Sequence, residues 1–216
     1  MGTKYGVEIE FFVIDKRSRK PVLLNQGEDD ILDNIGHDEY PVLGEVRSSV
    51  YEEVYLAVVD ALYRFKNVQN QLQDTGYEAH RISSMPLTRE IWEQVRRAGG
   101  KKCGVSERNL YGDKIKRPMN SKVITAGLHI HFSNGETYDE TCDCRCKRKY
   151  TIYKYAQVDI PHMVLQLDKK FKRVIERAGR QCGWYELKNY GFEYRSLPNS
   201  VDVNELIDFV HYKLEW

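Results

Sequence analysis

The feature that most constrains this chain is a pattern that recurs in four short segments. In each segment two ionisable side chains stand at positions i and i+2, and most of the residues around them are apolar. The four pairs are Glu8 and Glu10, Glu45 and Arg47, His129 and His131, and Glu193 and Arg195. Because residues i and i+2 of a strand project from the same face of a sheet, each segment is predicted to be a strand with one polar face.

The other segments complete the prediction of an α+β domain. Apolar residues recur at three- and four-residue steps over 50–73, which predicts a helix there. Further helices are predicted over 88–98 and 150–178 and from Asp202, and strands over 4–15, 42–48, 77–82, 123–133 and 190–197. We expect an irregular loop over 103–118 and an exposed excursion over 136–149. The alternation of polar and apolar residues favours an antiparallel sheet with helices packed on its apolar face.

Composition excludes several classes of protein. The chain has 216 residues, of which 41% are hydrophobic and 30% charged, and this is typical of one globular domain spanning 1–216. A formal net charge of +1 argues against nucleic acid as a partner. No apolar run approaches the roughly 20 residues of a membrane span, so a cytoplasmic location is expected. The 5 cysteines, odd in number and clustered, are expected to be reduced.

The predicted polar face indicates metal-assisted phosphate chemistry. Carboxylates on one surface repel each other unless cations neutralise them. Mg²⁺ and Mn²⁺ prefer oxygen ligands with an occasional imidazole, and arginine binds phosphate. The alternative for any one pair is a solvated strand face, but four pairs with apolar neighbours favour a functional surface. We expect this surface to be exposed, so that Glu193→Ala would remove its chemistry and leave the fold intact.

Three segments resemble a known enzyme family. Residues 6–11 (GVEIEF) resemble the first strand of carboxylate–amine ligases related to glutamate–cysteine ligase. Residues 127–132 (GLHIHF) are similar to their central Gly-x-His-x-His/Asn strand, and residues 190–199 (YGFEYRSLPN) to their late Glu-x-Arg-Ser strand. The resemblance is greatest to the compact phage-type COOH–NH2 ligases, to which 103–111 and 177–179 are also similar. The matches stand in family order from residue 6 to residue 199.

The resemblance implies ATP-dependent amide-bond formation on a curved, glutamine-synthetase-like sheet. In this family an acceptor carboxylate attacks the γ-phosphate of ATP, and an amine then attacks the acyl phosphate. Divalent cations connect the phosphates to acidic residues. The implied cofactors are ATP and Mg²⁺ or Mn²⁺, and the implied partners are small-molecule or peptide carboxylates and amines. A homo-oligomer is a further expectation, and a viral chain would work in the host cytoplasm.

The resemblance also implies roles for individual residues. The implied metal ligands are Glu8, Glu10, Glu45, Glu52, His129 and Glu193, with Glu53 as the rival of Glu52. The implied catalytic residues are Glu193, Arg195 and Arg47, and the implied nucleotide-binding residues are His129, Arg195, Lys172 and Arg173. His129 matches the family's histidine better than His131 does. For Lys172 and Arg173 the alternative is a solvated helix face.

Some residues depart from the family pattern and leave alternatives open. Relatives carry a Pro-Asp pair after the cysteine that matches Cys103, and this chain does not. The substrate that this loop would select is therefore open.

Three alternative functions are also open. An enzyme alternative is a phosphotransferase of the guanidino-kinase type, and a non-enzyme alternative is a degenerate ligase fold that acts in binding or assembly. Cys142, Cys144 and Cys146 leave a zinc-dependent nucleic-acid module as a third alternative, against an exposed reduced loop.

Overall fold

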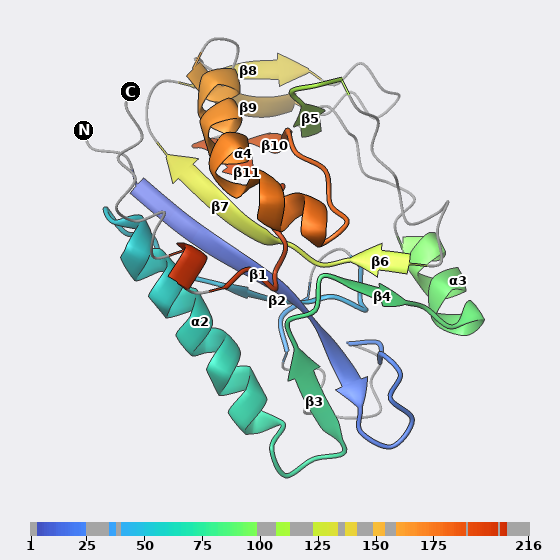
Figure 1. The fold of residues 1–216 in the computed structure, drawn as a ribbon. Helices are drawn as coiled ribbons and strands as arrows, with labels where there is room; N and C mark the ends of the chain where they lie inside the picture. The colour runs from blue at the N-terminus through green and yellow to red at the C-terminus, as the bar shows by residue number, and fades with distance from the viewer. Residues whose placement is uncertain are drawn as a thin grey trace.

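The computed structural model describes most of the chain and shows a mixed α+β architecture (Figure 1). The described residues are 4–24, 35–37, 40–98, 107–112, 123–133, 137–141, 149–153, 159–188, 190–202 and 204–206. Among them, no helix is both long enough and apolar enough to span a bilayer. Cys142, Cys144 and Cys146 lie outside the described residues.

The centre of the fold is a sheet whose strands all pair antiparallel. Its strands, in spatial order, are β2 (Gly44–Arg47), β1 (Lys4–Asp15), β7 (Leu128–Ser133), β11 (Gly191–Tyr194), β10 (Trp184–Lys188) and β5 (Glu107–Asn109). The second half of β1 also pairs with β3 (Tyr77–His80). The antiparallel α+β prediction is therefore confirmed, and the four strands that carry the ionisable pairs are consecutive neighbours.

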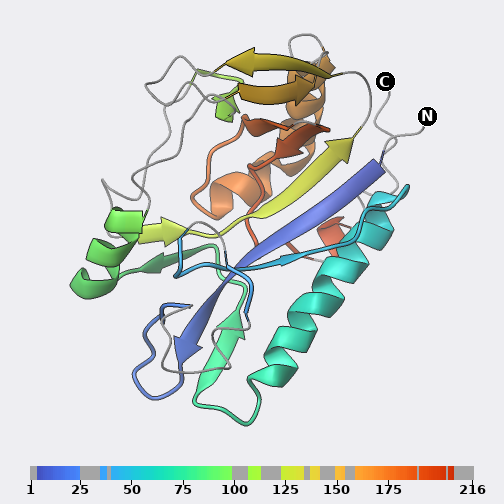
Figure 2. The same ribbon diagram turned by 180° about the vertical axis from the view of Figure 1, so that it is seen from behind.

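Two helices cover one face of this sheet, as the two opposite views show (Figures 1 and 2). They are α2 (Val54–Gln71) and α4 (Asp159–Arg177). Their buried side chains, such as Val58 and Phe171, share one core cluster with Ile9, Ile130 and Tyr194 of the strands. Because apolar residues alternate with ionisable ones along these strands, this packing turns the ionisable residues toward the opposite face.

A smaller layer packs beside the far end of β1. It consists of α3 (Arg89–Ala98) and a pair of short strands, β4 (Ser84–Pro86) and β6 (Val123–Thr125). Phe12, Met85, Val95 and Ile124 belong to its apolar cluster. Thr88 begins α3 as predicted, because its Oγ1 accepts a hydrogen bond from the backbone N–H of Ile91 at 3.3 Å.

Several predicted elements are corrected by the structure. Residues 149–153 form β9, which pairs with β8 (Thr137–Thr141), so the predicted helix over 150–178 begins only at Asp159. The irregular loop of 103–118 contains β5, and the single strand of 123–133 is divided into β6 and β7. A strand as short as β9 has too few residues for periodicity alone to distinguish it from the first turn of a helix.

We predict that Gly191→Ala severely destabilises the fold. A Cβ at this position would lie 1.9 Å from the carbonyl oxygen of Phe132, so β7 and β11 would have to separate. We expect a loss of about 3 kcal/mol or more in the free energy of unfolding, measured by urea denaturation. Gly76→Ala is the matched control, because a Cβ there meets nothing within 4 Å. Equal unfolding midpoints for the two variants would contradict this pairing of the strands.

Candidate metal centre

The strand register brings the four ionisable pairs into one cluster. Glu8 of β1 is paired with Arg47 of β2 on one side and with His129 of β7 on the other. Across the next interface, Glu193 of β11 is paired with His131 of β7. Cross-strand partners on one face of an antiparallel sheet are close enough to interact, so residues distant in sequence form a single polar surface.

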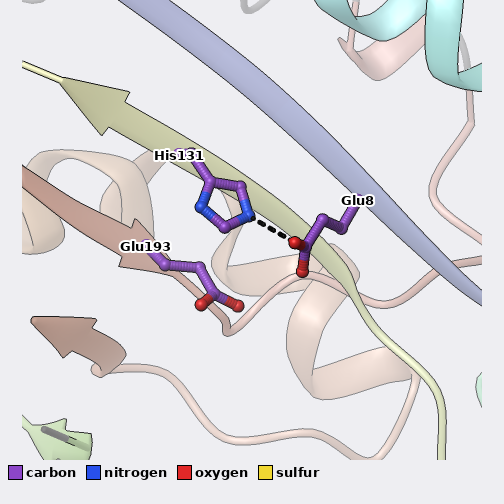
Figure 3. Close-up of side chains that lie close together, drawn as sticks. All are labelled: Glu8, His131 and Glu193. Carbon is purple, nitrogen blue, oxygen red and sulfur yellow. Dashed lines mark ion pairs between the residues drawn. The ribbon is translucent and has the colours of Figure 1, made fainter. Parts of the chain in front are cut away.

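Three residues of this surface could hold a metal ion, and Figure 3 shows their side chains turned toward one another. They are Glu8, His131 and Glu193, and one ligand atom of each lies within 4.8 Å of the other two. Nε2 of His131 is 3.2 Å from Oε1 of Glu8. We call these three residues the triad.

His129 lies beside the triad with a side chain that is only 3% exposed. Its Nδ1 is 2.8 Å from Oε1 of Glu193 and 3.7 Å from Oε2 of Glu8. Its Nε2 is 3.8 Å from Oε2 of Glu10, which also accepts a hydrogen bond from the backbone N–H of Gly127. The buried imidazole therefore connects carboxylates of β1 and β11, the two strands that flank β7.

Gly127 makes room for this imidazole. A Cβ at Gly127 would lie 2.6 Å from Nε2 of His129 and 3.0 Å from Nη2 of Arg180. Arg180 donates hydrogen bonds to the carbonyl oxygens of Arg195 and Ser196, so it cannot move away without losing them. The glycine before β7 is therefore required for the position of His129 rather than for a turn.

Cationic side chains neutralise the carboxylates of the surface. Arg195 lies 2.9 Å from Glu193 and 2.8 Å from Glu186, a residue of β10. Lys188 lies 2.7 Å from Glu193 and 3.1 Å from Glu186. At the other edge, Arg47 forms ion pairs with Glu8 and Glu45. The sheet face is thus a network of mixed charge rather than an uncompensated acidic patch.

This network keeps the triad carboxylates ionised. Burial alone would raise the pKa of Glu193, but Arg195, His129 and Lys188 hold it well below its usual value. Burial also acts to raise the pKa of Glu8, but the neighbouring imidazoles of His129 and His131 outweigh burial and lower it. Both residues are therefore anionic at neutral pH, as cation ligands must be.

The structure corrects the expectation that this surface is exposed. Glu10, Glu45, His129 and Glu193 are all buried, and Glu193 is 0% exposed. Replacing Glu193 by alanine would leave Arg195, Lys188 and His129 without this carboxylate. Removing one partner of a buried ion pair leaves an uncompensated charge, so Glu193→Ala is expected to reduce stability as well as any activity.

Most of the residues implied by the resemblance meet at this surface, and three do not. The surface contains Glu8, Glu10, Glu45, Arg47, His129, Glu193 and Arg195. Glu52 is exposed ahead of α2 and is not part of the triad. Lys172 and Arg173 are exposed on α4, with Lys172 3.8 Å from Glu176. Because α4 covers the apolar face, the sheet lies between both side chains and the triad, so the structure does not bring them to the polar surface.

Three members of the surface, Glu186, Lys188 and Tyr190, were not predicted from the sequence. His131 was predicted on this face but ranked below His129; it belongs to the triad, and its Nδ1 is 2.5 Å from the hydroxyl oxygen of Tyr190. Glu186 and Lys188 form a fifth i, i+2 pair, within the alternating residues of β10. That alternation could have been found from the sequence. The position of Tyr190 depends on the turn between β10 and β11 and carried no such signal.

The donor set of the triad fits a divalent cation. Two carboxylates and one imidazole are ligands that Mn²⁺ accepts readily and Mg²⁺ accepts with water completing its shell. Nε2 of His131 and Oε2 of Glu193 are buried and make no hydrogen bond, although each has an ionisable neighbour. Since Lys188 lies 2.7 Å from Oε2 of Glu193, a cation there would have to displace this ammonium group.

No family model, curated protein or solved structure matched this chain in the comparisons. The resemblance to carboxylate–amine ligases therefore stays a prediction. What the surface can do is argued below from its own geometry and charge.

We predict that the metal-free protein loses stability as pH rises. Burial and Arg195 act to lower the pKa of His129, but Glu10 and Glu193 outweigh them and raise it from 6.5 to about 9. A raised pKa in the folded state gives stability that is complete below pH 6.5 and is lost as pH rises through about 9. Urea denaturation with chelator should show a loss on the order of 3 kcal/mol across this range. His129→Gln should flatten the profile, and an equal slope in both proteins would contradict the assignment.

We predict that Mn²⁺ binding depends on Glu193 far more than on Glu186. The two carboxylates are cross-strand neighbours and share Lys188 and Arg195, but only Glu193 belongs to the triad. Titration followed by electron paramagnetic resonance should show at least about tenfold weaker binding for Glu193→Gln and little change for the matched variant Glu186→Gln. Equal losses would indicate a general charge effect and no defined ligand position.

Proposed function

We propose that this chain is an ATP-dependent carboxylate–amine ligase that works with Mg²⁺ or Mn²⁺ on a glutamine-synthetase-like sheet. The observation that carries the proposal is the meeting of ionised carboxylates, imidazoles and guanidinium groups from five consecutive strands on one face. Transfer of a phosphoryl group requires mainly positioning and neutralisation of negative charge, and these residue types supply both.

The triad would hold the cation, with His129 and Glu10 beside it. Glu8 and Glu193 supply anionic oxygens and His131 supplies an imidazole nitrogen. When bound, the cation neutralises charge on the phosphoryl oxygens. The hydroxyl of Tyr190 contacts Nδ1 of His131 and so directs Nε2 of the same ring toward Glu8.

Two arginines would bind the anionic groups of the substrates. Arg195, with a side chain 19% exposed, is anchored by Glu186 and Glu193 and would contact the γ-phosphoryl oxygens. Arg47 is 68% exposed at the edge of the surface and would bind the acid. The oxygen of the acid then attacks the γ-phosphorus and ADP leaves. The nitrogen of the amine attacks the acyl carbon, and phosphate leaves with the amide bond formed.

One observation favours a non-catalytic alternative. Glu193 and Glu186 already have Lys188 and Arg195 as cationic partners, so the surface is neutralised without a metal ion. A network of this kind can persist in a degenerate ligase fold that acts only in binding or assembly. The two functions differ in whether a divalent cation and a nucleotide bind to this face.

We predict Mg²⁺-dependent binding of a non-hydrolysable ATP analogue. Calorimetry should detect binding with Mg²⁺ and none with chelator, and Arg195→Gln should weaken it by about tenfold or more, since a charge-assisted hydrogen bond is lost. Lys172→Gln is the matched control, because this residue lies on the opposite face of the sheet.

Either of two results would contradict the proposal. The first is the absence of nucleotide binding by a folded wild-type protein, which would favour the degenerate fold. The second is a loss of binding in Lys172→Gln with none in Arg195→Gln, which would place the nucleotide on the helical side. A positive result would justify a screen of acids and amines for phosphate release.

A further inference from the structure

A cavity of about 340 Å³ opens directly beside the triad. Glu8 and His131 form part of its wall, so any group bound in it would touch two of the three candidate metal ligands. The rest of the wall comes from the first residues of β1, the end of β2 with the segment after it, the end of β7, and Tyr190 just before β11. Its size is at the lower end of the range for small-molecule sites, which suits a group of amino-acid size.

A glycine near the start of β1 borders the cavity. Gly6 is paired with His131 and shares the polar face of β1 with Glu8. A Cβ at Gly6 would lie 3.7 Å from Cβ of His131 and 4.0 Å from Oγ of Ser48, which are ordinary contacts. The backbone would therefore accept a side chain here, and what the glycine provides is open space next to the triad.

The wall of the cavity combines apolar and cationic groups. Val50 is 66% exposed and Tyr190 is 39% exposed, and both border the cavity. These two side chains give the cavity an apolar surface that a ligand could contact. Lys4, Arg47 and the anionic Glu8 all line the cavity. An anion would therefore lie at Lys4 and Arg47, and Glu8, which is paired with Arg47, offsets part of their charge.

A second cavity lies on the other side of Arg47 and differs in chemistry. Its volume is about 490 Å³, and its wall includes Arg64, Asn67 and Gln71. The guanidinium and amide groups of this wall would bind a strongly polar portion of a ligand. Of the two cavities that meet at Arg47, the one beside the triad is therefore the better site for an apolar substrate group.

We propose that the cavity beside the triad binds the side chain of the acid substrate, and that this acid is a small carboxylate with an aromatic or branched aliphatic group. This inference rests on the ligase function proposed above and adds the substrate class. The carboxylate lies toward Arg47 and the triad, and the apolar group lies between Val50 and Tyr190. A flat apolar ligand part could also be the adenine of the nucleotide, so the test includes both.

The test uses phenylacetate as the probe and measures its binding by ligand-observed NMR. Wild-type protein should bind phenylacetate with chelator present, and should bind glutarate, whose tail is polar, and neutral adenosine much more weakly. Gly6→Val should weaken phenylacetate binding by about tenfold or more, because it fills the cavity. Gly76→Val is the matched control in open space. Val50→Asp, at an exposed position, should repel the carboxylate, with Val59→Asp of α2 as its control.

Added Mn²⁺ gives the orientation of the probe. The methylene protons of phenylacetate should relax faster than the ring protons, because the carboxylate lies toward the triad. Tighter binding of adenosine than of phenylacetate, with sensitivity to Gly6→Val, would assign the cavity to the nucleotide and overturn the inference. Phenylacetate binding that neither Gly6→Val nor Val50→Asp changes would also overturn it.

The design separates this inference from the ligase function. Phenylacetate binding that responds to both cavity variants, in a protein that binds no nucleotide, keeps the carboxylate site and overturns the ligase function. Nucleotide binding without any binding of phenylacetate keeps the ligase function and overturns the substrate class.

Discussion

The interaction on which this structure depends is the pairing of the buried, ionised carboxylate of Glu193 with the cationic groups around it. Burial of one carboxylate without partners would cost several kcal/mol. Arg195, Lys188 and His129 prevent this by surrounding it with positive charge or hydrogen-bond donors. These partners come from β10, β7 and the end of β11, so one charge fixes the relative position of three strands.

This constraint gives the two faces of the sheet different roles. The apolar face packs against α2 and α4 and supplies the main core. The opposite face keeps carboxylates, imidazoles and guanidinium groups in contact, at a cost that a purely structural surface would avoid with apolar residues. This network lies beside the cavity that Gly6 borders, and both features support the ligand binding proposed above.

The sequence predicted which residues share the polar face of the sheet better than it predicted which of them form the candidate metal centre. Period-two alternation assigned Glu8, His129 and Glu193 to strands, and the antiparallel order then placed them together. It could not distinguish His131 from His129, because that depends on the register with β11 and on the space left by Gly127. Residue type carries charge but not the side of the sheet on which α4 packs, so the sequence could not show that Lys172 lies away from the polar face. Lys188 was missed although β10 has the same alternation.

The most direct measurement is a crystal structure with Mn²⁺ and a non-hydrolysable ATP analogue, with anomalous diffraction used to locate the manganese. Our account predicts an anomalous peak between Glu8, His131 and Glu193, with the phosphates next to Arg195 and with Lys188 moved away from Glu193. A folded protein with Lys188 still on Glu193 and no manganese on this face would contradict it. The surface would then be an ion-pair network that holds strands together and does no phosphate chemistry.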